Sequence, residues 1–165
     1  MKISVIIGTK DREESLKETL ASLCRQGRRP DEILLIDDGN LKESDWRSWS
    51  VSQRAPLQYF KKEKAGLTVS RNLGVKKTHG DILLFLDDDV ILEPDYLQLI
   101  LDIYERDPEK TIGGVGGVLL VKKSPLKNLL NTGVTTETMP IGGSSSDSIF
   151  DAFLPCFRHL PSKLF

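Results

Sequence analysis

The hydrophobic residues of this chain fall into short apolar runs that are separated by longer stretches with helical spacing. Apolar runs occupy residues 2–7, 32–36, 57–60 and 82–86. They are too short for independent helices and predict strands buried on both faces. Residues from about 11 to 27 and 96–104 carry the pattern of helices with one apolar side, and helices are also expected over 44–53 and 67–78. This fourfold alternation predicts an α/β fold with a mostly parallel sheet and helices on both of its faces.

Some local signals refine the helix predictions. Asp11 is expected to cap the first helix, with Glu14 completing a capping box, and Gly27 fits the end of that helix. Trp46 and Trp49 are three residues apart and could share one helical face, which we interpret as core or lid packing.

The regular pattern ends near residue 122. Residues 112–121 combine four glycines with aliphatic residues, which is typical of a strand with a bulge or a close backbone approach. Residues 123–148 are rich in Ser, Thr, Gly and Asn, and the apolar tail after them is interrupted by Pro155 and Pro161. We therefore expect an α/β core over 1–122 and a loop-rich, incomplete region over 123–165.

Composition excludes several classes of protein. The 23 basic and 24 acidic residues give a net charge of -1, so bulk electrostatics predict no nucleic-acid partner. No apolar run is long enough to span a bilayer or to form a secretory signal. Only Cys24 and Cys156 occur, so we expect no disulfide framework or thiolate zinc site, and a cytoplasmic location.

Acidic residues gather where the predicted strands end. Asp87-Asp88-Asp89 follow the 82–86 strand, Asp37-Asp38 follow the 32–36 strand, and residues 8–11 follow the first strand. Ligands of open α/β sheets bind outside the carboxyl ends of the strands. Adjacent carboxylates repel one another, and a hard divalent cation relieves that repulsion. A solvated turn remains the alternative for each cluster, but their shared edge favours a metal site.

Four ordered motifs carry a resemblance to a known family. They are Val5 to Arg12, Glu32 to Gly39 with its terminal Asp-Asp-Gly, Gly66 to Gly74 with Arg71-Asn72, and Gly80 to Asp89 followed by Pro94-Asp95. Over residues 2–122 the chain looks like the GT-A-fold glycosyltransferases of family two. That resemblance implies a Rossmann-like core that binds a nucleotide-diphosphate sugar.

The resemblance also implies roles for residues in a nucleotide pocket. Gly8, Thr9 and Asp11 would line it, and Asp38 would accept the ring N–H of the base, most often uracil. Arg71 would place a fixed positive charge near the nucleotide or the acidic cluster. An ion pair that only neutralises aspartates is the competing interpretation of Arg71. Lys62 and Lys64 we interpret as a solvated basic loop.

The metal site and the reaction follow from the same resemblance. Asp87 and Asp89 would form the Asp-x-Asp motif, with Asp89 as the direct metal ligand. Asp88 would lie near the ribose or hydrogen-bond to a group that binds the metal. Mn²⁺ or Mg²⁺ would bridge the diphosphate and stabilise its charge as it leaves. The implied reaction moves a sugar, with inversion, from a UDP-sugar to an unknown saccharide, lipid or protein acceptor. Peripheral contact with the inner face of a membrane is compatible with that role.

An inverting transfer also needs a general base for the acceptor hydroxyl. After Ile112 the acidic residues are Glu137, Asp147 and Asp151, and Asp151 is the best candidate among them. None has a recognisable motif, so we expect a donor-binding half without most of its acceptor half.

Two other classes of function remain open. One is a non-catalytic module that binds a nucleotide or nucleotide sugar. The other is a phosphotransferase or phosphatase, but such enzymes place an Asp directly after the first strand, where Gly8-Thr9-Lys10 stands. The chain also lacks a Walker-type loop.

Overall fold

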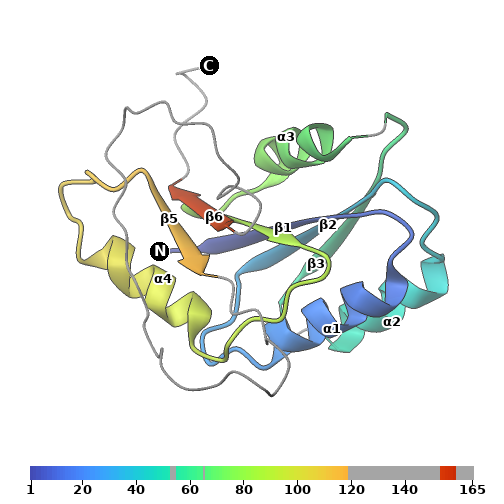
Figure 1. Cartoon of the computed structure of the whole chain (residues 1–165), viewed down its shortest axis with the longest axis horizontal. Helices are drawn as coiled ribbons and strands as arrows, with labels where there is room; N and C mark the ends of the chain where they lie inside the picture. Colours follow the sequence, from blue (N-terminus) through green and yellow to red (C-terminus); the bar gives the residue numbers. More distant parts are fainter. Residues whose placement is uncertain (53–54, 65, 119–152, 159–165) are drawn as a thin grey trace, which may run out of the picture.

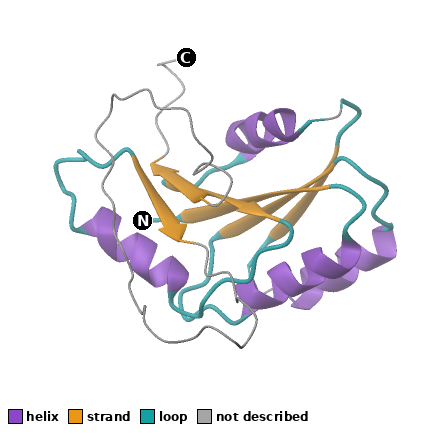
Figure 2. Ribbon diagram, viewed as in Figure 1, coloured by secondary structure: helices purple, strands orange, loops and turns teal. Residues whose placement is uncertain are grey.

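The computed structural model describes residues 1–52, 55–64, 66–118 and 153–158, and these ranges form one six-stranded sheet with four helices (Figures 1 and 2). In chain order the elements are β1 (Ile3–Thr9), α1 (Glu13–Cys24), β2 (Glu32–Asp37), α2 (Glu43–Ser52), β3 (Leu57–Lys61), α3 (Leu67–Lys77), β4 (Ile82–Asp87), α4 (Tyr96–Glu105), β5 (Gly114–Val118) and β6 (Phe153–Arg158). None of the helices in these ranges is long and apolar enough to cross a bilayer.

The sheet is mostly parallel, which confirms the predicted α/β class. Its strand order is β3-β2-β1-β4-β6-β5, and the pairs among β3, β2, β1 and β4 are all parallel. β6 pairs antiparallel with both β4 and β5. β6 was not predicted from the sequence, because a proline such as Pro155 argues against an internal strand. β6 adds residues from beyond 122 to the sheet of the core, and the domain division at that position stays a prediction.

Helices cover both faces of the sheet, as predicted. α1, α2 and α4 lie on one face and α3 lies on the other (Figure 1). Because side chains alternate along a strand, Val5 of β1 joins the larger core under α1, whereas Ile6 joins the smaller core under α3. Gly74 lets α3 approach closely, since a Cβ at that position would collide with the side chain of Ile6.

The order of the strands creates a crevice at one edge. The chain runs from β1 to β2 to β3 through α1 and α2 on one face, and α3 then returns it to β4 on the other side of β1. The direction of winding therefore reverses between β1 and β4, and in open α/β sheets ligands bind at such a switch point. Gly8 pairs in register with Asp87 there. The fold thus places the motifs at the ends of β1 and β4 side by side.

The predicted capping of the first helix is wrong. α1 begins at Glu13, its N-cap is Arg12, and no side chain caps it. Asp11 instead adopts a φ of 52°, and its Oδ1 accepts a hydrogen bond from the Asn40 N–H (2.9 Å). The carboxylate is used across the chain to hold the turn after β2, so it is not available to the helix.

Two other local predictions have different outcomes. Gly27 does not cap α1, whose C-cap is Arg25, and its N–H donates to the carbonyl of Pro94 (2.9 Å). The core interpretation of the tryptophans is confirmed, because both pack against the larger core. The ring of Trp46 stacks on Tyr59, with centroids 4.8 Å apart.

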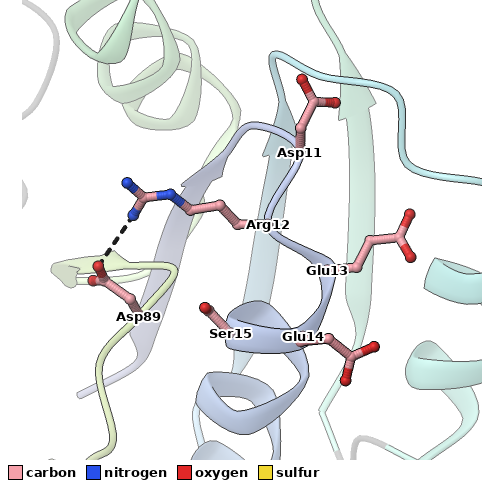
Figure 3. Close-up of a pocket in the computed structure, with 6 residues that line it drawn as sticks. All are labelled: Asp11, Arg12, Glu13, Glu14, Ser15 and Asp89. Atoms are coloured by element: carbon pink, nitrogen blue, oxygen red, sulfur yellow. Dashed lines mark hydrogen bonds and ion pairs between the residues drawn. The ribbon is translucent and has the colours of Figure 1, made fainter.

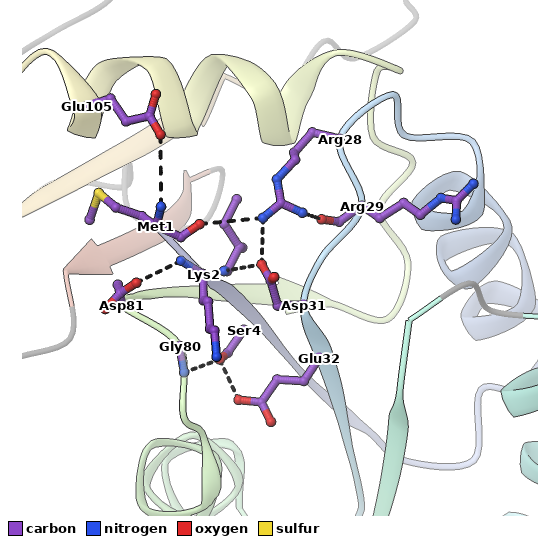
Figure 4. Close-up of polar contacts among 11 residues, drawn as sticks. Met1, Lys2, Ser4, Arg28, Arg29, Asp31, Glu32, Gly80, Asp81 and Glu105 are labelled. Atoms are coloured by element: carbon purple, nitrogen blue, oxygen red, sulfur yellow. Dashed lines mark hydrogen bonds and ion pairs between the residues drawn. The ribbon is translucent and has the colours of Figure 1, made fainter.

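The amino-terminal edge of the parallel strands is closed by a polar network (Figure 4). Asp31 Oδ2 accepts the Ile3 N–H (2.8 Å), and Asp81 Oδ2 accepts the Lys2 N–H (2.8 Å). The buried Glu32 accepts the His79 N–H through Oε1 (2.6 Å). Each of these acids therefore accepts a backbone N–H, and side-chain donors add to it, namely Arg28 at Asp31 (2.7 Å) and the Ser4 hydroxyl at Glu32 (2.6 Å).

Candidate functional site

A cleft of about 430 Å³ lies at the carboxyl ends of β1 and β4, against the first turns of α3. It is lined by Gly8, Thr9, Lys10, Arg12, Asp38, Leu67, Ser70, Asp87, Asp88 and Asp89. A second hollow of about 610 Å³ adjoins it over the start of α1 and is lined by Asp11, Arg12, Glu13, Glu14, Ser15 and Asp89 (Figure 3). Arg12 and Asp89 belong to both, so they mark the boundary between the two spaces.

Asp37 is the structural member of the Asp37-Asp38 pair. It is fully buried, and its Oδ1 accepts the Gly39 N–H (2.6 Å) while its Oδ2 accepts the Tyr59 hydroxyl (2.8 Å). The Leu41 N–H and the Lys61 ammonium also donate to Oδ2. Burial alone would raise the pKa of Asp37, but these donors outweigh it and hold the pKa below its usual value.

Asp38 is the member that faces the cleft. Its side chain is 14% exposed, and its Oδ2 accepts the Gly66 N–H (2.9 Å). Gly66 opens α3 with a φ of 126°, a conformation that favours glycine. This hydrogen bond, followed by the nearby charge of Lys62, lowers the pKa of Asp38. The carboxylate is therefore ionised at neutral pH and acts only as an acceptor.

Lys62 does not belong to a solvated loop, so that interpretation was wrong for this residue. Its side chain is only 5% exposed, and its Nζ donates to the Gly66 carbonyl (2.6 Å) and lies 3.4 Å from Asp38 Oδ2. The ammonium thereby ties the end of β3 to the start of α3. Sequence alone could not distinguish it from Lys64, which is exposed.

The three acids after β4 have different environments. Asp88 is nearly buried, and its Oδ2 accepts the Thr9 hydroxyl (2.7 Å). The side chains of Asp87 and Asp89 are 48% and 54% exposed. Among the described residues no group of three acidic, His or Cys side chains is already arranged to hold a metal ion. What the cleft offers is two exposed carboxylates on either side of an anchored one.

Two arginines form ion pairs with these acids. Arg12 Nη1 lies 3.1 Å from Asp89 Oδ2 and 3.4 Å from Asp88 Oδ1, and Figure 3 shows the first of these contacts. Arg71 Nη2 lies 3.5 Å from Asp87 Oδ1. The Arg71 guanidinium also lies over the Phe85 ring, 5.8 Å from its centroid. The predicted pairing of Arg71 with an aspartate is therefore present.

The structure brings most of the predicted site residues together. Gly8, Thr9, Asp38, Asp87, Asp88 and Asp89 line the cleft, and Arg71 contacts it through Asp87. Asp11 lies in the adjoining hollow, where it holds Asn40. Asp151 lies outside the described residues, so the predicted base has no structural counterpart here.

Four residues that line the cleft were given no individual role from the sequence: Lys10, Arg12, Leu67 and Ser70. Lys10 and Arg12 had a signal, because basic residues in the segment after the first strand stand opposite the acids of the neighbouring strand. Leu67 and Ser70 had none beyond their place in the first turns of a helix.

Comparison with known sequences identifies the family. A model of the family described as "Glycosyl transferase family 2" matches residues 4–132, which is most of the chain and includes every motif of the cleft. The chain belongs to this family.

Curated relatives agree with that assignment. The glucosyl-dolichyl phosphate glucuronosyltransferase of Haloferax volcanii is 32% identical over 123 residues, which are 73% of this chain and 39% of the relative. The validoxylamine A glucosyltransferase of Streptomyces hygroscopicus is 33% identical over 103 residues, 60% of this chain and 23% of that enzyme. The chain thus spans less than half the length of these family members.

Solved structures confirm the GT-A fold. The S. aureus TarS 1-349 complex with UDP has a TM-score of 0.58 at 23% identity and matches 80% of this chain and 39% of its own. The mannosyltransferase PcManGT of Pyrobaculum calidifontis, in complex with GDP-Man and Mn²⁺, has a TM-score of 0.60 at 19% identity. This match covers 71% of our chain and 35% of PcManGT.

Proposed function

We propose that this chain binds a nucleotide-diphosphate sugar, with a UDP-sugar as the preferred donor, for metal-assisted transfer of the sugar to an acceptor. One observation carries the proposal. A single cleft at the switch point of the sheet holds an ionised Asp38 at one side and the exposed carboxylates of Asp87 and Asp89 at the other. Such an arrangement can contact the base and the diphosphate of one nucleotide together.

Asp38 is proposed to recognise the base. Its contacts with Gly66 and Lys62 both use Oδ2, so we assign Oδ1 to the N–H of the base. A pyrimidine such as uracil has a ring N–H that suits this acceptor. Gly8 and Thr9 would form the floor beneath the nucleotide, and Leu67, which is 51% exposed, offers an apolar surface.

Asp87 and Asp89 are proposed to hold a Mn²⁺ or Mg²⁺ ion. Both are hard oxygen ligands that are half exposed, and this suits the chemistry of these cations. When bound, the ion would stabilise the charge that builds on the departing diphosphate. Asp88 would remain in its hydrogen bond with Thr9 and thereby fix the turn that presents its two neighbours.

Arg71 is proposed to add positive charge beside the diphosphate. Its contact with Asp87 is an ion pair between partly exposed groups and is worth little in water, so the guanidinium can exchange that partner for a phosphate. The ring of Phe85 keeps it close to the cleft. Asp11 would act indirectly, by holding the turn that follows Asp38.

The acceptor side of the reaction is a further part of the proposal. We propose an inverting transfer to a saccharide, lipid or protein hydroxyl, with Asp151 as the candidate base for the acceptor proton. The name of the Haloferax relative, which contains a dolichyl phosphate, favours a lipid-linked acceptor. Such an acceptor would bring the protein to the inner face of a membrane from a cytoplasmic location.

The test combines binding with turnover. Thermal-shift and calorimetric titrations would compare UDP with GDP, each with and without Mn²⁺, and a product assay would follow sugar release from UDP-sugars with candidate acceptors. The proposal expects UDP to bind more tightly with Mn²⁺ and a sugar to be transferred. Binding without any transfer would support the alternative of a non-catalytic nucleotide-sugar module, and absence of nucleotide binding would overturn both.

A further inference from the structure

Arg12 is the residue of the cleft that neither the motifs nor the proposed function explains. It lines both hollows, and its guanidinium contacts the anchored Asp88 and the exposed Asp89. Figure 3 shows the contact with Asp89. Its side chain is 58% exposed. Arg12 therefore occupies the region of negative potential where the proposed cation would have to enter.

The backbone of Arg12 is held by the fold, while its side chain is mostly exposed and makes two ion pairs through Nη1. Its carbonyl accepts the Leu16 N–H (3.0 Å) in the first turn of α1. The preceding Asp11 is fixed by its hydrogen bond with Asn40. The contacts of the guanidinium, in contrast, are single Nη1 contacts of 3.1 and 3.4 Å at the solvent boundary. Such ion pairs are weak and exchange easily.

We propose that Arg12 is a displaceable counter-charge that couples cation binding to diphosphate binding in this cleft. The inference rests on the proposed function, since it concerns the same cation and diphosphate. A divalent cation at Asp89 is positively charged, like the guanidinium, and competes with it for the same carboxylate oxygen. The bare cation must therefore displace Arg12, and this displacement weakens its binding.

When a diphosphate is also present, Arg12 has the opposite effect and favours binding of the cation. Once a cation and a diphosphate are present, the released guanidinium can pair with phosphate oxygens, for which its planar donors are well suited. Arg12 thus opposes the cation alone and favours the cation together with the diphosphate. In thermodynamic terms it adds a coupling free energy, so each ligand strengthens binding of the other.

The experiment replaces the charge and keeps a polar side chain of similar length. Binding of Mn²⁺ alone, of UDP alone and of UDP with saturating Mn²⁺ is measured by calorimetry for the wild type and for Arg12→Gln. The matched control is Arg47→Gln, which removes a guanidinium of similar exposure from an ion pair with Glu43 on α2. Arg47 lines neither of the two hollows. A melting curve of each variant confirms that it is folded.

For Arg12→Gln we expect Mn²⁺ alone to bind about threefold to fivefold more tightly, and UDP with Mn²⁺ to bind about fivefold more weakly. Arg47→Gln should match the wild type in all three binding measurements. Arg12→Lys keeps the charge but lacks the planar fork, so it should bind Mn²⁺ like the wild type and UDP with Mn²⁺ about twofold more weakly.

Several outcomes would overturn the inference. Unchanged or weaker Mn²⁺ binding in Arg12→Gln would show that the guanidinium does not compete with the cation. Unchanged binding of UDP with Mn²⁺ would show that it does not reach the diphosphate. Both results leave the proposed function intact as long as the wild type binds UDP and Mn²⁺. A wild type that binds neither ligand would overturn the proposed function and this inference together.

Discussion

The two edges of the parallel strands both carry acidic residues, but they satisfy them differently. At the amino edge, Asp31, Glu32 and Asp81 each accept a hydrogen bond from a backbone N–H group. Asp31 pairs with Arg28 in addition to its backbone donor (Figure 4). At the carboxyl edge, Asp87 and Asp89 contact arginine side chains and remain about half exposed. Backbone donors cannot leave without unfolding, whereas a guanidinium can turn away. The comparison indicates that the acids of the amino edge are structural and that those of the carboxyl edge can exchange partners for a ligand.

The same contrast exists between two adjacent residues at the end of β2. Asp37 is buried and bonded to donors of its own fold, while Asp38 faces the cleft and contacts Gly66 and Lys62 through one oxygen. Residue type alone therefore does not identify a ligand-binding acid. The two residues differ in that donors of the fold occupy both oxygens of Asp37 but only Oδ2 of Asp38.

The largest expected effect concerns Asp89. Asp89→Asn removes one charged ligand of the proposed cation, so it should lower the rate of sugar transfer about 100-fold or more. The affinity of the Asp89→Asn protein for UDP should no longer depend on Mn²⁺. Asp81→Asn at the opposite edge is the matched control and should leave UDP binding unchanged. Metal-dependent UDP binding that survives in Asp89→Asn would assign the metal to other residues.

The next effect concerns stability. Asp37→Asn places an amide among donors that need a carboxylate, and it should lower the free energy of unfolding by about 2–3 kcal/mol. Asp38→Asn should cost less than about 1 kcal/mol, because that residue is at the surface of the cleft. Urea denaturation of both variants measures the difference. Equal losses would contradict the division between a structural and a cleft-facing aspartate.

A smaller effect is expected for base recognition. Asp38→Ala should weaken binding of uridine about tenfold, which corresponds to about 1.4 kcal/mol. The loss should occur without metal, because this residue is proposed to act on the base. Calorimetry with uridine and with UDP separates the two possibilities. A loss confined to the diphosphate would move Asp38 to a different role.

The smallest effect is a pH dependence at the amino edge. Burial would raise the pKa of Glu32, but donors from Ser4 and His79 hold it below its usual value. Its contribution to stability is therefore complete above the unfolded-state pKa of about 4.3 and is lost as pH falls through the lower folded-state value.

Glu32→Gln should accordingly destabilise the protein by about 1 kcal/mol at pH 7 and by less at pH 3. Binding of UDP should not change, because this residue lies at the edge opposite the cleft. Urea denaturation at the two pH values tests the first statement. A penalty that grows toward acid would show that the sign of the pKa shift is wrong.

Periodic patterns in the sequence were enough to predict the fold class. The helices predicted at 44–53 and 67–78 form over Glu43–Ser52 and Leu67–Lys77. In α2 the spacing of Trp46 and Trp49 agrees with the side that packs on the core, whereas α3 buries Ser70 and Gly74 and not an apolar stripe. The gathering of acids at one edge also followed from the strand ends alone. β6 was missed because its pairing with β4 joins residues far apart in the chain and because Pro155 weakens the strand signal.

Details of the site depended on contacts that no local pattern contains. Asp11 was predicted to cap a helix but binds Asn40, and Arg12 reaches across to the turn after β4. Whether an acid is anchored, like Asp88, or exposed, like Asp89, is decided by neighbours from another strand, such as Thr9. These partners are distant in sequence, so they could be read only from the structure.

The most direct test of the central claim is a crystal structure of the chain soaked with Mn²⁺ and UDP. The exposed acids at the carboxyl edge should share one cation with the diphosphate, the base should lie against Asp38, and the acids at the amino edge should keep their backbone partners. A soaked crystal in which the cleft stays empty, or in which Asp87 and Asp89 point away from any common ion, would contradict the account.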